Sequence, residues 1–264
     1  MKIAAIQMVS TPVLAENLTS AQGLLRQAAA GGAGLLLLPE YWPLMGMHDS
    51  DKCALAEQAG QGEIQDFLAA MARELGVWLI GGTLPLLSGE AGKVYNTTLV
   101  FDPLGRQAAR YDKVHLFGFS KGEESYEEAR TITAGGQVAS FDAGFGKVGL
   151  SICYDLRFPE LYRALGTCSL IVVPAAFTYT TGQAHWEILL RARAIENQCY
   201  VLAAGQGGRH ANGRRTWGHS MLIDPWGGVL DVLAEGEGVV SGELDMDFLA
   251  RIRDSLPALK HRKL

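Results

Sequence analysis

The sequence has few cysteines, little net charge and no long apolar run. Four cysteines among 264 residues are too few for a disulfide framework. The formal net charge of −5 at pH 7 is mildly acidic, which argues against a general nucleic-acid-binding protein. All apolar runs are far shorter than the roughly 20 residues that a membrane-spanning helix requires. We therefore expect neither a nucleic-acid partner nor a membrane segment.

A secretory signal is also missing at the start of the sequence. The first residues, MKIAAIQMVSTP, contain only a short apolar run, which Gln7 interrupts. We therefore expect a cytoplasmic protein whose thiols stay reduced. Because a reduced cysteine either fills a core or does chemistry, the position of each cysteine matters.

The common cofactor motifs are absent. Gly146-Lys147 lacks the flanking residues of a phosphate-binding loop, and Gly205-Gln206-Gly207 lacks the third glycine of a dinucleotide fingerprint. No CxxC, HExxH or close histidine pair marks a metal site. Gly118–Gly122 matches the G-x-S-x-G nucleophile elbow, but the charged residues that follow cannot form an apolar helix face, so we expect a surface loop. We expect no metal and no organic cofactor.

Short apolar runs alternate with amphipathic stretches along the whole chain. Leu35–Leu38 has no polar residue, which is typical of a strand buried on both faces. Glu16–Ala30 shows the three- and four-residue apolar spacing of a helix. Further strands are predicted at Ile3–Val9, Val77–Leu87, Val94–Phe101, Arg106–Val114, Lys147–Cys153, Leu170–Ala176, Tyr200–Ala204, Trp217–Ile223, Gly228–Leu233 and Val239–Leu244, and further helices at Gly62–Leu75, Phe158–Leu165 and Gln183–Asn197.

This alternation predicts an α/β fold. Two halves of strands and helices, with both parallel and antiparallel strands, favour two mixed sheets that are each covered by helices. Such an arrangement is a four-layer α-β-β-α sandwich. No linker or low-complexity segment divides the chain, so we expect residues 1–264 to form a single domain.

One of the four cysteines has a position that suits chemistry. Cys168 and Cys199 begin apolar strands, which is typical of core residues. Cys53 lies on a predicted helix without any feature that indicates chemistry. Cys153 ends a predicted strand just before the helix that Pro159 begins. Ligands bind at such strand ends in α/β sheets, and the peptide N–H groups there lower a thiol pKa and can hold an oxyanion. On position alone, both a nucleophile and a buried core residue remain open.

Two other positions have the same character. Glu40 comes directly after the buried strand Leu35–Leu38, and Lys113 lies within the apolar stretch YDKVHL. A buried carboxylate must be paired or used, whereas a solvated turn residue needs no partner. An ordinary lysine at a strand edge is the alternative for Lys113. Spacing alone does not bring the two together with Cys153.

Several segments together resemble the carbon–nitrogen hydrolase (nitrilase-like) superfamily over essentially the whole chain. They are LLLLPE, RYDKVHLF, VGLSICYDLRFPEL, PAAFTYTTGQAHWEILLRARAIENQCYV and WGHSMLIDPWG. The resemblance implies that Glu40, Lys113 and Cys153 are the catalytic residues. It implies a second, supporting glutamate at Glu128, with Glu127 as the fallback.

The resemblance also implies a mechanism for hydrolysing a non-peptide C–N bond. Glu40 takes the proton of Cys153, and the thiolate attacks the amide carbonyl to give a thioester. Lys113 and the backbone N–H of Tyr154 stabilise the oxyanion. Glu40 then protonates the departing ammonia and activates the water that cleaves the thioester. Neither a metal nor an organic cofactor is needed.

Within the superfamily, His185–His210 and HSMLIDPWG most resemble amidases of deaminated glutathione and the related ω-amidases. This implies a small anionic amide as substrate, with deaminated glutathione first, and α-ketoglutaramate, N-carbamoyl amino acids and nitriles as alternatives. Arg157 is the candidate carboxylate clamp, and an ion pair with Glu160 is its alternative. Phe177, Thr178 and Thr181 are expected to line the pocket or to pack within a loop.

The resemblance further implies a homodimer or larger homo-oligomer, formed through the helices Phe158–Leu165 and Gln183–Asn197. Their apolar residues Trp186, Leu189 and Leu190 suit the internal core equally well. Two different classes of function also remain open. One is a Cys–His hydrolase with a histidine base at His115, His185 or His219, and the other is a non-catalytic binding relative.

Overall fold

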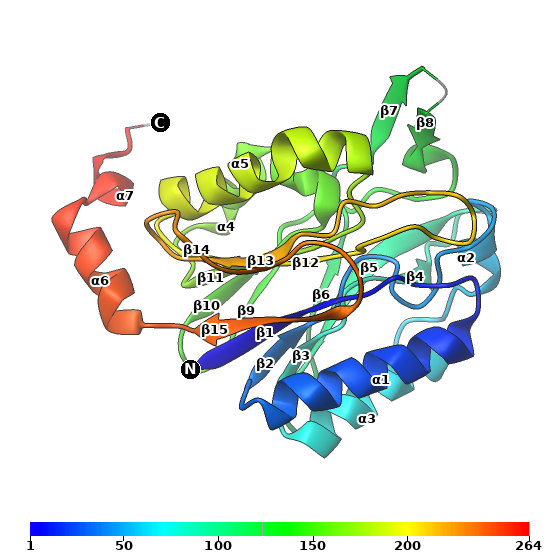
Figure 1. The fold of residues 1–264 in the computed structure, drawn as a ribbon, viewed down its shortest axis with the longest axis horizontal. Coiled ribbons are helices and arrows are strands. Elements are labelled where there is room, and N and C mark those ends of the chain that lie inside the picture. The colour runs from blue at the N-terminus through cyan, green and yellow to red at the C-terminus, as the bar shows by residue number, and fades with distance from the viewer. Residues whose placement is uncertain (123, 264) are drawn as a thin grey trace.

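The computed structural model describes residues 1–122 and 124–263, and two β-sheets lie face to face at its centre (Figure 1). The first sheet has the order β15-β1-β2-β3-β5-β4, with β6 also on β5, and the second has the order β14-β13-β12-β11-β10-β9. The strands of the first sheet are β1 (Lys2–Gln7), β2 (Leu35–Leu37), β3 (Trp78–Ile80), β4 (Leu84–Leu87), β5 (Val94–Phe101), β6 (Gln107–Asp112) and β15 (Gly238–Glu243). Those of the second are β9 (Ser140–Asp142), β10 (Lys147–Leu150), β11 (Leu170–Ala175), β12 (Tyr200–Gly205), β13 (Ser220–Ile223) and β14 (Val229–Leu233).

Helices cover the outer face of each sheet (Figure 1). The first sheet carries α1 (Leu14–Ala30) and α3 (Glu63–Leu75), and the second carries α4 (Pro159–Leu165) and α5 (Tyr179–Asn197). The four-layer α-β-β-α sandwich predicted from the sequence is confirmed. The remaining elements are α2 (Asp51–Ala54), the hairpin β7 (Gly118–Lys121) and β8 (Glu124–Glu127), η1 (Glu128–Arg130), η2 (Cys153–Arg157), α6 (Met246–Ser255) and α7 (Ala258–His261). No helix of the described ranges is long and apolar enough to cross a bilayer.

Strand β2 shows why the sequence forms these layers. Successive side chains of a strand point to opposite faces. Leu35 and Leu37 join the core that lies between the sheets and under α5, while Leu36 joins the core under α1 and α3. Both faces of the strand are fully buried, which explains the absence of any polar residue from this run.

The single strand predicted over Val77–Leu87 is wrong, because the chain turns inside it. Gly81 and Gly82 separate β3 from β4, and Gly82 has a left-handed φ of 56°. A Cβ at Gly82 would clash with the backbone carbonyl of Pro39, the residue before Glu40. The turn therefore packs directly against the segment that carries Glu40.

Two further predictions need correction. Gly118–Gly122, expected as a loop, contributes β7 to an exposed hairpin with β8, and Glu123 lies outside the described residues. The helix expected at Gln183 begins at Tyr179, because the Thr178 hydroxyl accepts a hydrogen bond from the N–H of Thr181 and caps the first turn.

Candidate active site

Glu40 lies just beyond β2, and its carboxylate is fully hydrogen-bonded inside the protein. Oε1 accepts from Asn96 Nδ2 and from Lys113 Nζ, both at 2.8 Å. Oε2 accepts from the backbone N–H of Ala176 at 2.9 Å, which ties the first sheet to the end of β11 in the second. The residue is only 1% exposed, so it is a positioned buried carboxylate and not a solvated turn residue.

Lys113 follows β6 and is buried between two carboxylates. Its Nζ lies 2.8 Å from Glu40 Oε1 and 2.9 Å from Glu128 Oε2. Burial alone would lower the pKa of this ammonium, but the charges of Glu128 and Glu40 outweigh it and raise the pKa well above its ordinary value. Lys113 therefore stays charged at any physiological pH.

Glu128, at the start of η1, completes this charge network. Its carboxylate also accepts the Tyr41 hydroxyl at 2.8 Å and the backbone N–H of Phe117 at 2.7 Å. Burial raises the pKa of this carboxyl, but the Lys113 ammonium and these donors more than offset it, so the pKa is lowered. Glu127, the alternative position, is exposed. The structure thus places Glu128, and not its neighbour, beside Lys113.

Cys153 stands at the beginning of η2 in a conformation that L-residues rarely adopt. Its φ is 48°, and Tyr41, next to Glu40, has a similar φ of 56°. Such strain persists only where the surrounding structure enforces it, and it gathers at functional sites. Two of the strained residues of this chain therefore face the same site.

Asp155 holds the bend at Cys153, and its role was not evident from the sequence. Its fully buried carboxylate accepts the N–H of Ile152 at 2.8 Å and the Tyr111 hydroxyl at 2.7 Å. It also meets the backbone and the ring of His115 at 3.0 and 2.7 Å. A carboxylate just before a helix is a capping signal that could have pointed to this residue.

The surroundings of Cys153 favour the protonated thiol, contrary to the prediction from its position at a strand end. Burial raises its pKa, and the neighbouring carboxylates of Glu40 and Glu128 raise it further. The Lys113 ammonium opposes them without cancelling them, so the pKa lies well above its ordinary value. A nucleophilic role for this sulfur would therefore require a base within reach, and the neighbouring Glu40 carboxylate is a candidate.

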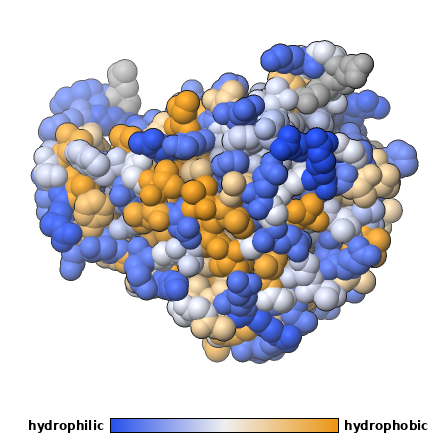
Figure 2. Space-filling model, in the orientation of Figure 1, coloured by the Kyte–Doolittle hydropathy of each residue, from blue (hydrophilic) through white to orange (hydrophobic). Residues whose placement is uncertain are grey.

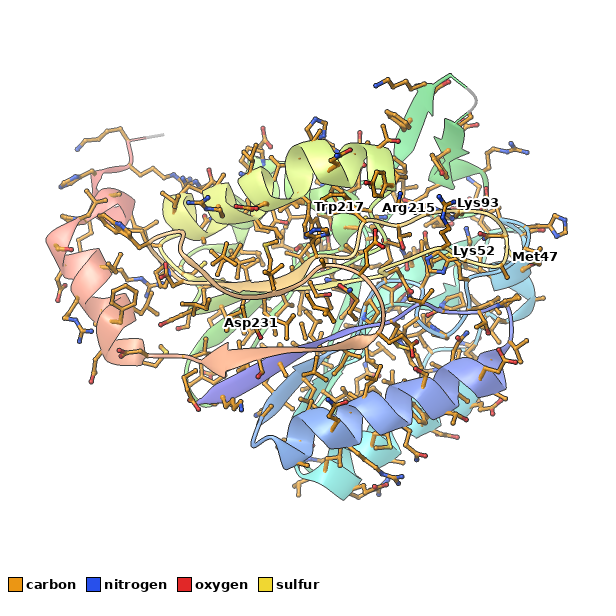
Figure 3. The ribbon with its side chains drawn as sticks, in the orientation of Figure 1. Met47, Lys52, Lys93, Arg215, Trp217 and Asp231 are labelled. Atoms are coloured by element: carbon orange, nitrogen blue, oxygen red, sulfur yellow. The ribbon has the colours of Figure 1, made fainter. Side chains whose placement is uncertain are left out.

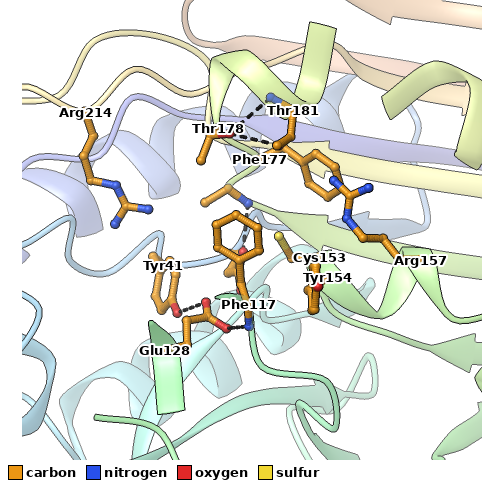
Figure 4. Close-up of a pocket in the computed structure, with 12 residues that line it drawn as sticks. Tyr41, Phe117, Glu128, Cys153, Tyr154, Arg157, Phe177, Thr178, Thr181 and Arg214 are labelled. Atoms are coloured by element: carbon orange, nitrogen blue, oxygen red, sulfur yellow. Dashed lines mark hydrogen bonds between the residues drawn. The ribbon is translucent and has the colours of Figure 1, made fainter. Parts of the chain in front are cut away.

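A pocket of about 320 Å³ opens above Cys153 (Figure 4). Lys113 lies behind its wall, bonded to two of the lining carboxylates. Every other site residue predicted from the sequence lines it. The lining residues are Glu40, Tyr41, Phe117, Glu128, Cys153, Tyr154, Arg157, Ala176, Phe177, Thr178, Thr181 and Arg214.

Two arginines lie on opposite sides of this pocket (Figure 4). Arg157 meets His185 Nδ1 at 3.1 Å and stacks over Phe177 at 5.4 Å, and the described residues show no ion pair between it and Glu160. Arg214, which the sequence analysis missed, stacks over Tyr126 at 4.9 Å. Neither guanidinium pairs with a carboxylate within the part of the chain that the structure describes.

Thr178 and Thr181 fulfil both roles that the sequence left open. They line the pocket, and their hydroxyls lie 2.9 Å apart at the cap of α5. Phe177 also lines the pocket while its ring packs 4.7 Å from Trp186 in the core.

None of the three histidines considered as a base lines the pocket among the described residues. His115 is bonded to Asp155, His185 to Arg157, and His219 Nδ1 to the Trp217 carbonyl at 2.8 Å. Within the same described ranges no cluster of metal-ligating side chains occurs.

The fold and this charge network match a known family. The chain belongs to the carbon-nitrogen hydrolase family, whose model matches residues 2–254. A deaminated glutathione amidase from Synechocystis sp. is 43% identical over 98% of this chain and 97% of its own length. Omega-amidase NIT2 from Mus musculus is 39% identical over 99% and 95%. The chain is thus a hydrolase of carbon–nitrogen bonds, of the amidase kind.

The solved structures agree on the fold. The crystal structure of the C. elegans NitFhit protein superposes with a TM-score of 0.89 at 37% identity, and the match covers 99% of this chain and 65% of that one. The nitrilase-like superfamily suggested by the sequence motifs is therefore confirmed.

Proposed function

We propose that the protein hydrolyses small anionic amides through a thioester on Cys153. The observation that carries this proposal is that Glu40, Lys113 and the Cys153 thiol meet at one buried point beneath an open pocket. Glu40 takes the thiol proton as the sulfur attacks the amide carbonyl. The carbonyl π-electrons move to oxygen, and the Lys113 ammonium and the N–H of Tyr154 stabilise the oxyanion.

The second half of the reaction uses the same groups. As the oxyanion collapses, the C–N bond breaks, and Glu40 returns its proton to the leaving nitrogen. A primary amide releases ammonia, and a substituted amide releases an amine. Glu40 then takes a proton from water, whose hydroxide cleaves the thioester and restores the thiol.

Glu128 acts through Lys113 in this proposal. With two carboxylates around one ammonium, Lys113 is held in place by charged hydrogen bonds at 2.8–3.0 Å. The ammonium therefore needs no reorganisation when the oxyanion forms, which is how preorganised electrostatic stabilisation works.

Deaminated glutathione is the substrate that we favour. Relatives of that activity match nearly the whole chain, and Arg157, which forms no ion pair with any residue that the structure describes, offers a clamp for a carboxylate. α-Ketoglutaramate is the alternative, which the equally extensive match to ω-amidases supports. Both substrates carry a carboxylate at the end of the acyl chain.

A substrate panel tests the proposal. Turnover of deaminated glutathione, α-ketoglutaramate, an N-carbamoyl amino acid and a simple nitrile is measured by the release of amine or ammonia. We expect the first to give the highest kcat/KM. A preference for the nitrile or the carbamoyl compound would contradict the proposed substrate.

We further propose that residues 1–264 act as one catalytic domain, in the cytoplasm, and as a homodimer. The site draws on both sheets, which supports the single domain, and the four free thiols suit a reducing compartment.

On α5, Trp186 and Leu190 are buried in the core, so they do not serve an interface, whereas Ile188 and Ile195 are exposed. Figure 2 shows a further apolar surface over β14, where Val229, Leu230 and Val232 are exposed. Light scattering of the wild type and of Ile188→Lys tests the dimer.

A further inference from the structure

A second recess opens beyond Tyr41, on the side of the pocket away from Arg157. Its volume is about 310 Å³, and it shares Tyr41 and Arg214 with the pocket above Cys153. Lys52, from α2, forms part of its wall. Figure 3 shows Lys52 at the same end of the molecule as Arg215, the neighbour of Arg214. The recess is thus a continuation of the reaction pocket.

The recess holds two cations, Lys52 and Arg214. Lys52 donates to the Thr131 hydroxyl at 3.1 Å and lies 5.5 Å from the Tyr41 ring. Arg214 stacks on Tyr126. Among the described residues neither cation makes an ion pair, although both side chains are only partly exposed to solvent.

The acidic groups nearby do not neutralise these cations. Glu128 is already bonded to Lys113 and Tyr41, and Asp49 lies exposed at the rim beside His48. Burial lowers the pKa of Lys52, and the Asp49 and Glu128 charges offset this only in part, while Arg214 adds to it. A bound anion would stabilise both cations at once.

We propose that Lys52 and Arg214 bind a carboxylate carried by the leaving amine of the substrate. This inference rests on the proposed function, and its direction follows from the position of Glu40. The leaving nitrogen must come within reach of Glu40 to receive its proton. Tyr41 is the next residue and forms the wall into the recess, so a substituent on that nitrogen points toward Lys52 and Arg214. The acyl portion then extends toward Tyr154 and Arg157 (Figure 4).

The chemical class of substrate follows from this arrangement. It is an amide with an anion on the acyl side and a short amine substituent that ends in a second carboxylate, such as a dipeptide. Deaminated glutathione fits this description, because its glycine carboxylate lies on the amine side. α-Ketoglutaramate has only the acyl-side carboxylate and leaves the recess empty.

Three substrates distinguish binding of the amine-side carboxylate from binding of the acyl portion. They are deaminated glutathione, the same compound with its glycine carboxylate converted to a carboxamide, and α-ketoglutaramate. For the wild type we expect KM to rise about tenfold or more when the carboxylate becomes a carboxamide, as charge-assisted contacts would give. Arg214→Gln and Lys52→Met should each raise KM for deaminated glutathione about tenfold and leave the other two substrates within about twofold.

Arg215→Gln is the matched control, because Arg215 already pairs with Glu235 at 2.6 Å. It should leave all three KM values unchanged. Equal KM values of the wild type for carboxylate and carboxamide would overturn the recess as an anion site. The anion site would also be overturned if Arg214→Gln lost as much activity on α-ketoglutaramate as on deaminated glutathione. Arg214 would then act on the reaction itself.

Calorimetry keeps this inference separate from the proposed function. Cys153→Ala protein is titrated with deaminated glutathione and with its carboxamide, in the presence and absence of the Arg214→Gln change. Tighter binding of the carboxylate that depends on Arg214 supports the recess, whatever the wild type turns over. A wild type that hydrolyses none of the amides would instead contradict the proposed function.

Discussion

The reaction centre and the two ends of the pocket differ in whether their charged groups have partners within the protein. Around Glu40, Lys113 and Glu128 every charged oxygen has a donor at 2.7–3.0 Å inside the protein. At the ends, Arg157 and Arg214 have only ring or histidine neighbours among the described residues. Under the proposed function, the centre is complete before substrate arrives, and the substrate completes the two ends.

The difference follows from burial. A charge taken fully out of water must be paired, or it costs several kcal/mol. Glu40 and Lys113 are 1% and 0% exposed, so they depend on each other. Arg157 and Arg214 remain partly exposed to water, so their charges need no carboxylate partner when the pocket is empty. Substitutions in the centre should therefore change kcat and folding, and those at the ends should change KM.

The largest effect is expected at Glu40. Glu40→Gln keeps the shape of the side chain but removes the proposed base and acid of every step, so kcat should fall by about 10²–10⁴-fold. Steady-state kinetics measure this loss, and thermal melting shows whether the fold survives. Glu127→Gln is the control on an exposed glutamate. A kcat within tenfold of the wild type would mean that another group carries the proton.

Lys113→Met should affect both catalysis and stability. Loss of one oxyanion donor typically costs about 10²–10³-fold in rate. Removal of the ammonium also leaves Glu40 and Glu128 as buried, uncompensated carboxylates, at a cost of about 3–5 kcal/mol in the free energy of unfolding. Urea unfolding of the variant measures the second effect. Unchanged stability would contradict the argument that the network is held by charge.

Arg157→Gln tests the pocket end that holds the acyl side. We expect KM to rise about tenfold with kcat within a few-fold, because the contact is made equally in the ground state and the transition state. Glu160→Gln is the control, because the two residues form no ion pair in the described structure. Equal effects of both changes would favour the ion-pair interpretation of Arg157.

The smallest effect concerns stability at low pH. The Lys113 ammonium holds the pKa of Glu128 below its ordinary value. A carboxyl with a lowered folded-state pKa stabilises the fold above its unfolded pKa, about 4.3, and this contribution is lost as pH falls through the folded pKa. Glu128→Gln should therefore lower Tm at pH 7 and make the decline of Tm between pH 5 and pH 3 shallower. Parallel pH curves for the two proteins would contradict this.

The same comparison explains what the sequence could predict. Glu40 and Cys153 follow apolar strands, and Lys113 lies within a short motif after β6. Local pattern marked each of them as a candidate, and the family resemblance predicted that they meet. Arg214 lies in the segment between β12 and β13, and no local spacing reveals that it lines the pocket. Tyr41 directly follows Glu40, but its hydrogen bond to Glu128 joins two distant segments of the chain. Asn96 looks like any polar residue of β5, although it donates to Glu40 at 2.8 Å.

The thiol pKa failed as a prediction for a related reason. The strand-end position of Cys153 indicated N–H groups that favour a thiolate, but the carboxylates beside it come from distant parts of the chain. The fold was easier to predict from the sequence, because the local periodicity of apolar residues determines β2 and α1. Where a close backbone approach was decisive, as at Gly82, the prediction failed.

The central claim is that Cys153 carries the acyl group. The most direct test is intact-mass spectrometry of protein quenched in acid during turnover of deaminated glutathione, followed by peptide mapping. We predict an added acyl mass on the peptide with Cys153 in the wild type, and none on Cys53, Cys168 or Cys199. Cys153→Ala should show no adduct and no turnover with an unchanged fold. Turnover by Cys153→Ala, or an adduct on another cysteine, would contradict the account.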